Sequence, residues 1–216
     1  NRSIEDARYV PPPPRALSGL LSNWERYYHA DEKDRLVQLA IVHAQFELIH
    51  PFLDGNGRIG RIVLPLFLAE HKLIIRPTFY LSAYMERSRE EYVERLGAVS
   101  RTGDWNGWIE YFLQAVIAEG AHNAEQASAI LGLYDEMKTT VVALTHSRFA
   151  IQAIDALFAM PLFPGPMFVE RSGIPKQTGL RILKQLSENG VLRVLRPGRG
   201  RRPTLYSFER LVELAQ

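Results

Sequence analysis

The stretch HPFLDGNGRIGR, residues 50–61, constrains the fold of this chain more than any other feature. It separates two segments with helical patterning: residues 35–50 carry an apolar stripe, and residues 58–73 are again apolar with helical spacing. Pro51 disfavours the α conformation at His50, so the first helix is expected to end there. The sequence therefore predicts two helices joined by a short loop that is rich in glycine and charge.

The residue types in this loop are typical of an anion-binding site. A glycine-rich turn that leads into a helix exposes backbone N–H groups at the positive end of the helix dipole. Gly55 and Gly57 allow the backbone to approach an anion closely. Arg58 and Arg61 are three residues apart, so they lie on one helix face, and their guanidinium groups suit phosphate oxygens. The loop is therefore predicted to bind phosphate.

Two further side chains add chemistry to this predicted site. Asp54 is the one acid in the loop, and an aspartate beside bound phosphates commonly holds Mg²⁺. His50 stands at the end of the preceding helix, where it can accept a proton from an attacking hydroxyl. Taken singly, a histidine at a helix end is more often structural, and surface arginines are more often solvated or paired. Their combination within twelve residues favours a phosphate-transfer site.

Composition and the remaining motifs narrow the class of protein. The 216 residues are 46% hydrophobic and 23% charged, as in ordinary globular domains. There is no cysteine, which excludes a thiolate metal site and fits a reducing, cytoplasmic setting. The apolar run at residues 62–69 is far shorter than the roughly 20 residues of a membrane span, and residues 1–10 lack the apolar segment of a signal peptide. No P-loop, dinucleotide fingerprint or H-E-x-x-H metal motif occurs.

Charge divides the chain into two expected domains. Residues 1–150 carry 16 basic and 19 acidic residues, whereas residues 151–216 carry 10 and 5. Almost everything before residue 145 has helical patterning. We therefore expect a mainly α-helical domain over residues 1–145 and a second, basic domain over residues 148–216.

The second domain shows the pattern of a winged helix-turn-helix. Residues 167–190 read as two helices joined at Gly173, with Leu180, Leu183 and Leu186 facing inward, and residues 191–208 read as two strands around an arginine-rich turn. The candidate DNA contacts are exposed polar positions on the second helix and at the tip of the turn: Gln177, Arg181, Lys184, Arg199, Arg201 and Arg202. The alternative is a docking module, because winged helices also serve in protein contacts.

Every defined position of residues 50–61 matches the signature H-P-F-x-D/E-G-N-G-R-x-x-R of Fic-domain proteins, and the resemblance extends over roughly residues 6–125. It implies a Fic helical core with a β-hairpin flap, and transfer of AMP from ATP to a Ser, Thr or Tyr hydroxyl of a target protein. His50 would be the base and Asp54 would hold Mg²⁺. Phe52 would anchor the loop in the core. The implied nucleotide-binding residues are Gly55, Asn56, Gly57, Arg58, Gly60, Arg61 and, on the adenine side, Tyr92.

Several alternatives remain open beside this resemblance. Tyr92 could equally be a core aromatic. Residues 1–10 resemble one strand of the flap, which would bind the target by strand addition, although a simple packing strand is the alternative. The family's inhibitory motif, S/T-x-x-x-E-G/N, has no match here, so its helix is expected upstream of residue 1.

The expected partners are a target protein, DNA at the tail and a second copy of the chain, with no membrane partner. The alternative functions are transfer of another phosphate-containing group and DNA-binding regulation by a nucleotide-sensing Fic site.

Overall fold

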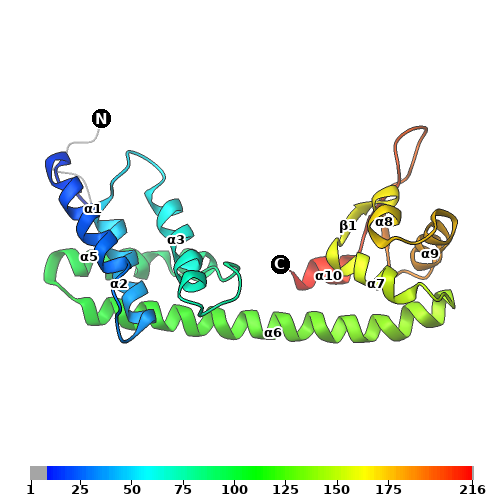
Figure 1. The fold of residues 1–216 in the computed structure, drawn as a ribbon, viewed down its shortest axis with the longest axis horizontal. Coiled ribbons are helices and arrows are strands. Elements are labelled where there is room, and N and C mark those ends of the chain that lie inside the picture. Colours follow the sequence, from blue (N-terminus) through cyan, green and yellow to red (C-terminus); the bar gives the residue numbers. More distant parts are fainter. Residues whose placement is uncertain (1–8, 216) are drawn as a thin grey trace. The chain divides into compact units, whose positions relative to one another are not determined.

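A computed structural model of the protein describes residues 9–215, and the described chain divides into two compact units, Asn1–His122 and Asn123–Gln216 (Figure 1). The division falls inside the long helix α6 (Trp105–Thr145), earlier than the boundary expected near residues 145–148. The predicted flap strand lies almost entirely outside the described residues, which include only its last two positions, Tyr9 and Val10. Within the described residues, none of the helices is long and apolar enough to cross a bilayer.

From Pro14 onward, the regular secondary structure of the first unit is helical, as the sequence predicts for its core. Its helices are α1 (Pro14–Tyr28), α2 (Arg35–Ile49), α3 (Asn56–Glu70), α4 (Ser82–Arg87), α5 (Arg89–Thr102) and the first part of α6. Pro14 is the first residue of α1, where a missing N–H is tolerated. Asp34 caps α2, because its Oδ1 accepts hydrogen bonds from the backbone N–H groups of Leu36 and Val37 at 2.9 and 3.1 Å.

Helix α2 lies at the centre of the first unit. The buried indole of Trp108 on α6 donates a hydrogen bond to the Ala40 carbonyl at 2.8 Å. On another side of α2, the amide of the buried Gln38 donates to the carbonyls of Tyr27 and Ala30 at 2.8 and 2.9 Å. Helix α3 packs against α2 through Leu64, Phe67 and Leu68, which belong to the same core cluster. The loop between α2 and α3 is therefore held at both ends by buried helices.

The second unit contains helices and one small antiparallel sheet. Its elements after α6 are α7 (Ala150–Ala159), β1 (Leu162–Pro164), α8 (Gly165–Ser172), α9 (Lys176–Glu188), β2 (Arg193–Arg196), β3 (Leu205–Ser207) and α10 (Glu209–Leu214). The strand order is β1-β3-β2, and Phe163 of β1 pairs with Tyr206 of β3. The sequence pattern predicted β2 and β3, whereas β1 was not predicted.

The core of the second unit explains why that unit begins before α7. Phe163, Phe168 and Phe208 are fully buried at its centre. Leu133, Met137 and Val141, from the second part of α6, belong to the same cluster. The prediction that Leu180 faces inward is wrong, since its side chain is 44% exposed. The buried face of α9 is formed by Gly179, Ile182, Leu183 and Leu186, and Leu180 lies beyond its edge.

Candidate active site

His50 stands at the point where α2 ends. Its backbone is left-handed, with φ 48° and ψ 57°, and its N–H donates to the Phe46 carbonyl at 3.0 Å. A left-handed backbone is uncommon for a residue other than glycine, and such residues cluster at functional sites. The exposed imidazole has its Nδ1 3.3 Å from the Glu47 carbonyl oxygen. A proton on Nδ1 would donate to that oxygen, which leaves Nε2 with a free lone pair facing solvent.

The side chain of Asn56 closes the loop that follows. Asn56 is buried, its Oδ1 accepts the N–H of Phe52 at 2.9 Å, and its Nδ2 donates to the Phe52 carbonyl at 2.6 Å. The expectation that the Phe52 side chain anchors the loop in the core is wrong, because that side chain is 50% exposed. The loop is instead held through the backbone of Phe52, whose N–H and carbonyl both form hydrogen bonds with the side-chain amide of Asn56.

Helix α3 begins at Asn56, two residues earlier than predicted, and Gly55 precedes it with φ 85°. The first bond of this helix runs from the Ile59 N–H to the Gly55 carbonyl at 3.0 Å. The backbone N–H groups of Asn56, Gly57 and Arg58 come before that first bond. They have no partner within the helix, and backbone N–H groups of this kind at the start of a helix can bind anions. A Cβ at Gly57 would lie 3.3 Å from Arg61 Nη1, so a larger residue there would require the end of the Arg61 side chain to shift slightly.

The charged groups at the mouth of the loop are paired with each other. Asp54 Oδ2 lies 3.2 Å from Arg58 Nη2, while Asp54 Oδ1 accepts the Gly55 N–H at 2.7 Å. Both side chains of this ion pair are largely exposed, 93% for Asp54 and 73% for Arg58. An exposed pair of this kind contributes about 0–1 kcal/mol, so either partner can exchange it for a ligand.

Asp54 could contribute to a Mg²⁺ site only if waters and the phosphates of a bound nucleotide supplied the other metal ligands. Across residues 9–215 there is no group of three His, Cys, Asp or Glu side chains that could hold a metal ion. Mg²⁺ is commonly bound by one or two carboxylates, by waters and by substrate phosphates. A single exposed carboxylate beside a phosphate-binding loop fits that pattern.

A carboxylate that the sequence did not single out lies behind the loop. Glu47 is 9% exposed, and its Oε1 has no hydrogen-bond partner within the described part of the chain. A Cβ at Gly60 would overlap this oxygen, so Gly60 on α3 leaves the space that Glu47 on α2 fills. Burial raises the pKa of Glu47, while the electrostatic interactions of its carboxylate with His50 and Arg61 oppose the rise. The part of Gly60 in nucleotide binding stays a prediction.

Tyr92 lies on α5 in a buried aromatic group. Its hydroxyl is 3.1 Å from Nε2 of the buried His43, and its ring contacts those of Trp108 and Tyr111. Burial lowers the pKa of His43 to about 4, so His43 is neutral near pH 7, and burial also raises the pKa of Tyr92. This placement favours a core role for Tyr92, and its adenine contact stays a prediction.

The predicted site residues fall into two groups, one in each unit. His50, Asp54 and the glycines and arginines of residues 55–61 come together in the first unit. In the second unit the predicted DNA contacts are all exposed: Gln177, Arg181 and Lys184 on α9, and Arg199, Arg201 and Arg202 between β2 and β3.

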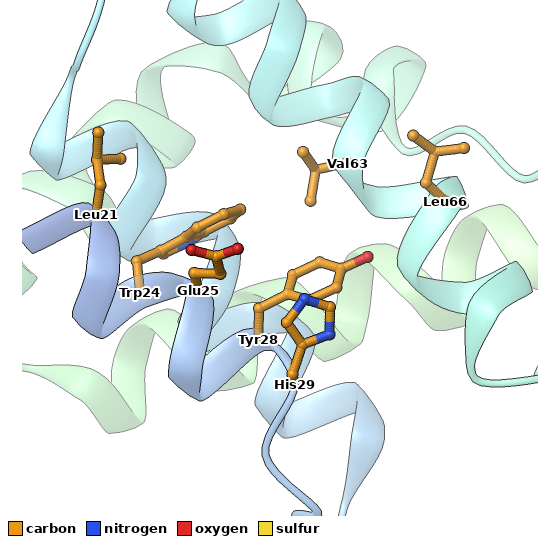
Figure 2. Close-up of a pocket in the computed structure, with 7 residues that line it drawn as sticks. All are labelled: Leu21, Trp24, Glu25, Tyr28, His29, Val63 and Leu66. Atoms are coloured by element: carbon orange, nitrogen blue, oxygen red, sulfur yellow. The ribbon is translucent and has the colours of Figure 1, made fainter.

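A cavity of about 330 Å³ lies between α1 and α3 in the first unit (Figure 2). Its walls are mainly apolar and aromatic, and the side chains that line it are Leu21, Trp24, Glu25, Tyr28, His29, Val63 and Leu66. No predicted site residue is among them, and its walls offer no guanidinium or lysine to a phosphate. The cavity therefore lacks the side chains expected of a phosphate site, and phosphate binding by the His50 loop stays a prediction.

Comparison with known proteins agrees with the geometry of this loop. Residues 1–68 match the Fic/DOC family. A probable protein adenylyltransferase from Aquifex aeolicus is 36% identical over 94 residues, which cover 43% of this chain and 27% of that protein. The protein adenylyltransferase Fic of Drosophila yakuba is 35% identical over 63 residues, which cover 28% of this chain and 13% of that protein. The matches thus span 27% of the first of these curated relatives and 13% of the second.

The fold is also similar to a solved structure. The crystal structure of a Fic family protein from Desulfovibrio desulfuricans G20 aligns with a TM-score of 0.53 and 21% identity, over 92% of this chain and 56% of that one. The matched residues 1–68 include the whole His50 loop, and the curated relatives are similar over part of the chain only. Residues 1–68 therefore match the Fic/DOC family, and the chain is similar to Fic proteins over this part of its length.

Proposed function

We propose that this chain transfers AMP from ATP to a Ser, Thr or Tyr hydroxyl of a target protein, in a reaction that depends on Mg²⁺. The observation that carries the proposal is the position of His50. Its imidazole lies with Nδ1 3.3 Å from the Glu47 carbonyl oxygen, and the residue stands six positions before Asn56, the first residue of α3. The related proteins named protein adenylyltransferase support AMP as the transferred group.

Each part of the site has a role in this reaction. The backbone N–H groups at the start of α3 bind phosphate oxygens, and Arg58 and Arg61 neutralise their charge. The target hydroxyl oxygen attacks the α-phosphorus of ATP and forms a new P–O bond. The bond from that phosphorus to the bridging oxygen of the β-phosphate breaks, and pyrophosphate leaves. Nε2 of His50 accepts the hydroxyl proton.

Asp54 would hold Mg²⁺ together with the nucleotide phosphates. The bound cation would neutralise charge on the phosphate oxygens. For Asp54 to do so, its carboxylate must give up the exposed ion pair with Arg58, and that guanidinium is then free to contact phosphate. Breaking this one ion pair would therefore free Asp54 to hold Mg²⁺ and Arg58 to contact phosphate.

The second unit is proposed to be a winged-helix module. Its element order after α6 is helix, strand, two helices and two strands, which is the order expected of that fold, followed by the short helix α10. The sheet order β1-β3-β2 places the hairpin of β2 and β3 at its edge.

Two alternatives for the first unit would use the same loop. One is transfer of another phosphate-containing group, and the other is nucleotide sensing without transfer. Sensing requires the predicted phosphate-binding residues 55–61 alone, whereas a hydrogen bond from Nδ1 of His50 to the Glu47 carbonyl would leave Nε2 able to accept a proton. That geometry favours transfer over sensing.

The test is to incubate the protein with ATP and Mg²⁺ and to follow AMP attachment to itself and to lysate proteins by mass spectrometry. His50→Ala should lower the rate by about 10²- to 10⁴-fold, because a general base is lost. ATP binding by calorimetry should be nearly unchanged, since residues 55–61 form the cradle. His122→Ala, at an exposed histidine of α6, is the matched control and should retain full activity.

Two results would contradict the proposal. Modification by the His50→Ala variant at the wild-type rate would exclude His50 as the base. An adduct of a different mass in the wild-type protein would support the transfer of another group.

A further inference from the structure

We propose that the second unit binds duplex DNA, with α9 in the major groove and the β2–β3 hairpin on the phosphate backbone. The basis is a concentration of positive charge that the transfer reaction does not use. Residues 176–202 hold eight basic side chains and one acid: Lys176, Arg181, Lys184, Arg193, Arg196, Arg199, Arg201 and Arg202, against Glu188. All nine side chains are exposed.

The arginines of the hairpin are free to contact a ligand. Arg193 is paired with Glu209 at 2.7 Å, so it is excluded from the count. Arg196, Arg199, Arg201 and Arg202 form no ion pair with the residues that the structure describes. Four exposed guanidinium groups on one hairpin repel one another, and a polyanion would relieve that repulsion.

The backbone of the hairpin tip is ordered although its side chains are free. Arg199 and Arg202 exchange two backbone hydrogen bonds of 3.0 Å each, and Gly200 between them has φ 58°. The Gly198 N–H donates to Thr204 Oγ1 at 3.0 Å. The tip therefore presents its arginines from a fixed turn, which lowers the entropy lost on binding.

Helix α9 has the features of a helix that reads base edges. Gln177, Arg181 and Lys184 are exposed at spacings of four and three residues, so they lie on one face. They span seven residues, about 10 Å along the helix axis, which is close to three base pairs. Arginine pairs with guanine and glutamine with adenine in the major groove, which is wide enough to admit a helix.

Leu180 also belongs to this face and favours DNA over a purely electrostatic ligand. It is 44% exposed between Gln177 and Lys184, one turn from each, and it contributes little to the core. An apolar side chain among polar ones can contact the methyl group of thymine in the major groove. A surface that binds only phosphate has no use for it.

The affinity for DNA should depend on the hairpin arginines. We would measure binding of the full chain to a labelled random-sequence 30-base-pair duplex by fluorescence anisotropy, from 50 to 200 mM salt and without ATP. Arg199→Ala/Arg201→Ala/Arg202→Ala should weaken binding at least about tenfold at 100 mM salt and reduce the salt slope by about 2.7. The control Arg15→Ala/Arg26→Ala/Lys33→Ala removes the same charge from exposed positions of the first unit. It should change neither the affinity for DNA nor the salt slope.

Base reading is tested separately at Gln177, because its substitution alters no charge. Duplexes would be selected from a random library with the wild-type protein. Gln177→Ala should lose about 5- to 150-fold in affinity for the selected site and keep its affinity for random duplex.

Three results would overturn the proposal. They are no binding at 50 mM salt, equal effects of the two triple variants, and equal competition by heparin or by double-stranded RNA. Because the assay contains no ATP, its failure would leave the proposed transfer reaction untouched.

Discussion

Replacing Gly60 with alanine should destabilise the first unit, although alanine is the better helix former. Gly60 lies in α3 with its missing side chain directed at Glu47 on α2. A Cβ at this position would overlap Glu47 Oε1 and would lie 3.2 Å from Glu47 Cδ and 3.3 Å from Phe46 Cδ1. Both neighbouring side chains are buried, so neither can move away without disturbing the packing between the two helices.

The size of the effect follows from two opposing contributions. Overpacking a core by one carbon typically costs about 1–3 kcal/mol. The higher helix propensity of alanine returns about 1 kcal/mol. The expected net loss is therefore up to about 2 kcal/mol. Gly120→Ala is the matched control, because Gly120 is in α6 of the same unit and a Cβ there would meet nothing within 4 Å. That change should stabilise the unit by about 0.5–1 kcal/mol.

Urea unfolding followed by tryptophan fluorescence measures this directly. The three tryptophans of the chain, Trp24, Trp105 and Trp108, all belong to the first unit, so the signal reports that unit alone. Shortening the carboxylate should relieve the overlap, so Gly60→Ala/Glu47→Asp should be at least about 0.5 kcal/mol more stable than the sum of the single changes. A Gly60→Ala variant that is stabilised as much as Gly120→Ala would refute the reasoning.

Three further predictions concern single side chains of the first unit. Asp54→Ala should change stability by less than about 0.5 kcal/mol, because its ion pair is exposed, but should abolish the effect of Mg²⁺ on ATP affinity in calorimetry. An unchanged Mg²⁺ effect would exclude the proposed role of Asp54. Tyr92→Phe should cost about 0.5–1.5 kcal/mol in urea unfolding, because His43 loses its hydrogen-bond partner, and equal stability would argue against that bond. His43 has a pKa of about 4 when folded and an ordinary value of 6.5, so the unfolded chain binds more protons between these values. Stability should therefore fall as pH drops from 6.5 to 4, by up to about 1.4 kcal/mol per pH unit, and His43→Phe should remove that dependence. The raised pKa of Glu47 acts in the opposite direction in both proteins, so it cancels in the comparison, and parallel pH curves would contradict a neutral His43.

Local rules of sequence were sufficient to predict the helices on both sides of the site. Pro51 ends α2 at the expected residue, and the start of α3 was misplaced by only two positions. In each case the decisive interaction is between residues a few positions apart, such as the cap that Asp34 forms on α2. The sequence could not place the phenyl ring of Phe52, because an apolar residue in a loop can be held by its backbone alone.

Elements whose place in the fold depends on contacts between residues far apart in the sequence could not be predicted from local sequence patterns. β1 is three residues long and exists because β3, more than forty residues later, pairs with it. The second part of α6 has helical patterning that is compatible with either unit. Only the contacts of Leu133 and Met137 with the α7–α10 core show that it belongs to the second.

The buried carboxylate of Glu47 changes how the glycines of the signature are explained. From sequence, Gly55 and Gly57 were expected to let the backbone approach a bound anion closely, and the family resemblance implied that Gly60 binds nucleotide. In the structure, Gly55 has the positive φ that such a turn requires, and Gly57 leaves room beside the guanidinium of Arg61. Gly60 instead leaves room for Glu47, on the side of α3 that faces α2. A glutamate on a helix ordinarily faces solvent, so nothing in the local pattern marks this one as buried. The signature therefore combines residues of the predicted nucleotide site with one glycine that makes room for a carboxyl group on α2, so substitutions at Gly57 and Gly60 should have different physical consequences.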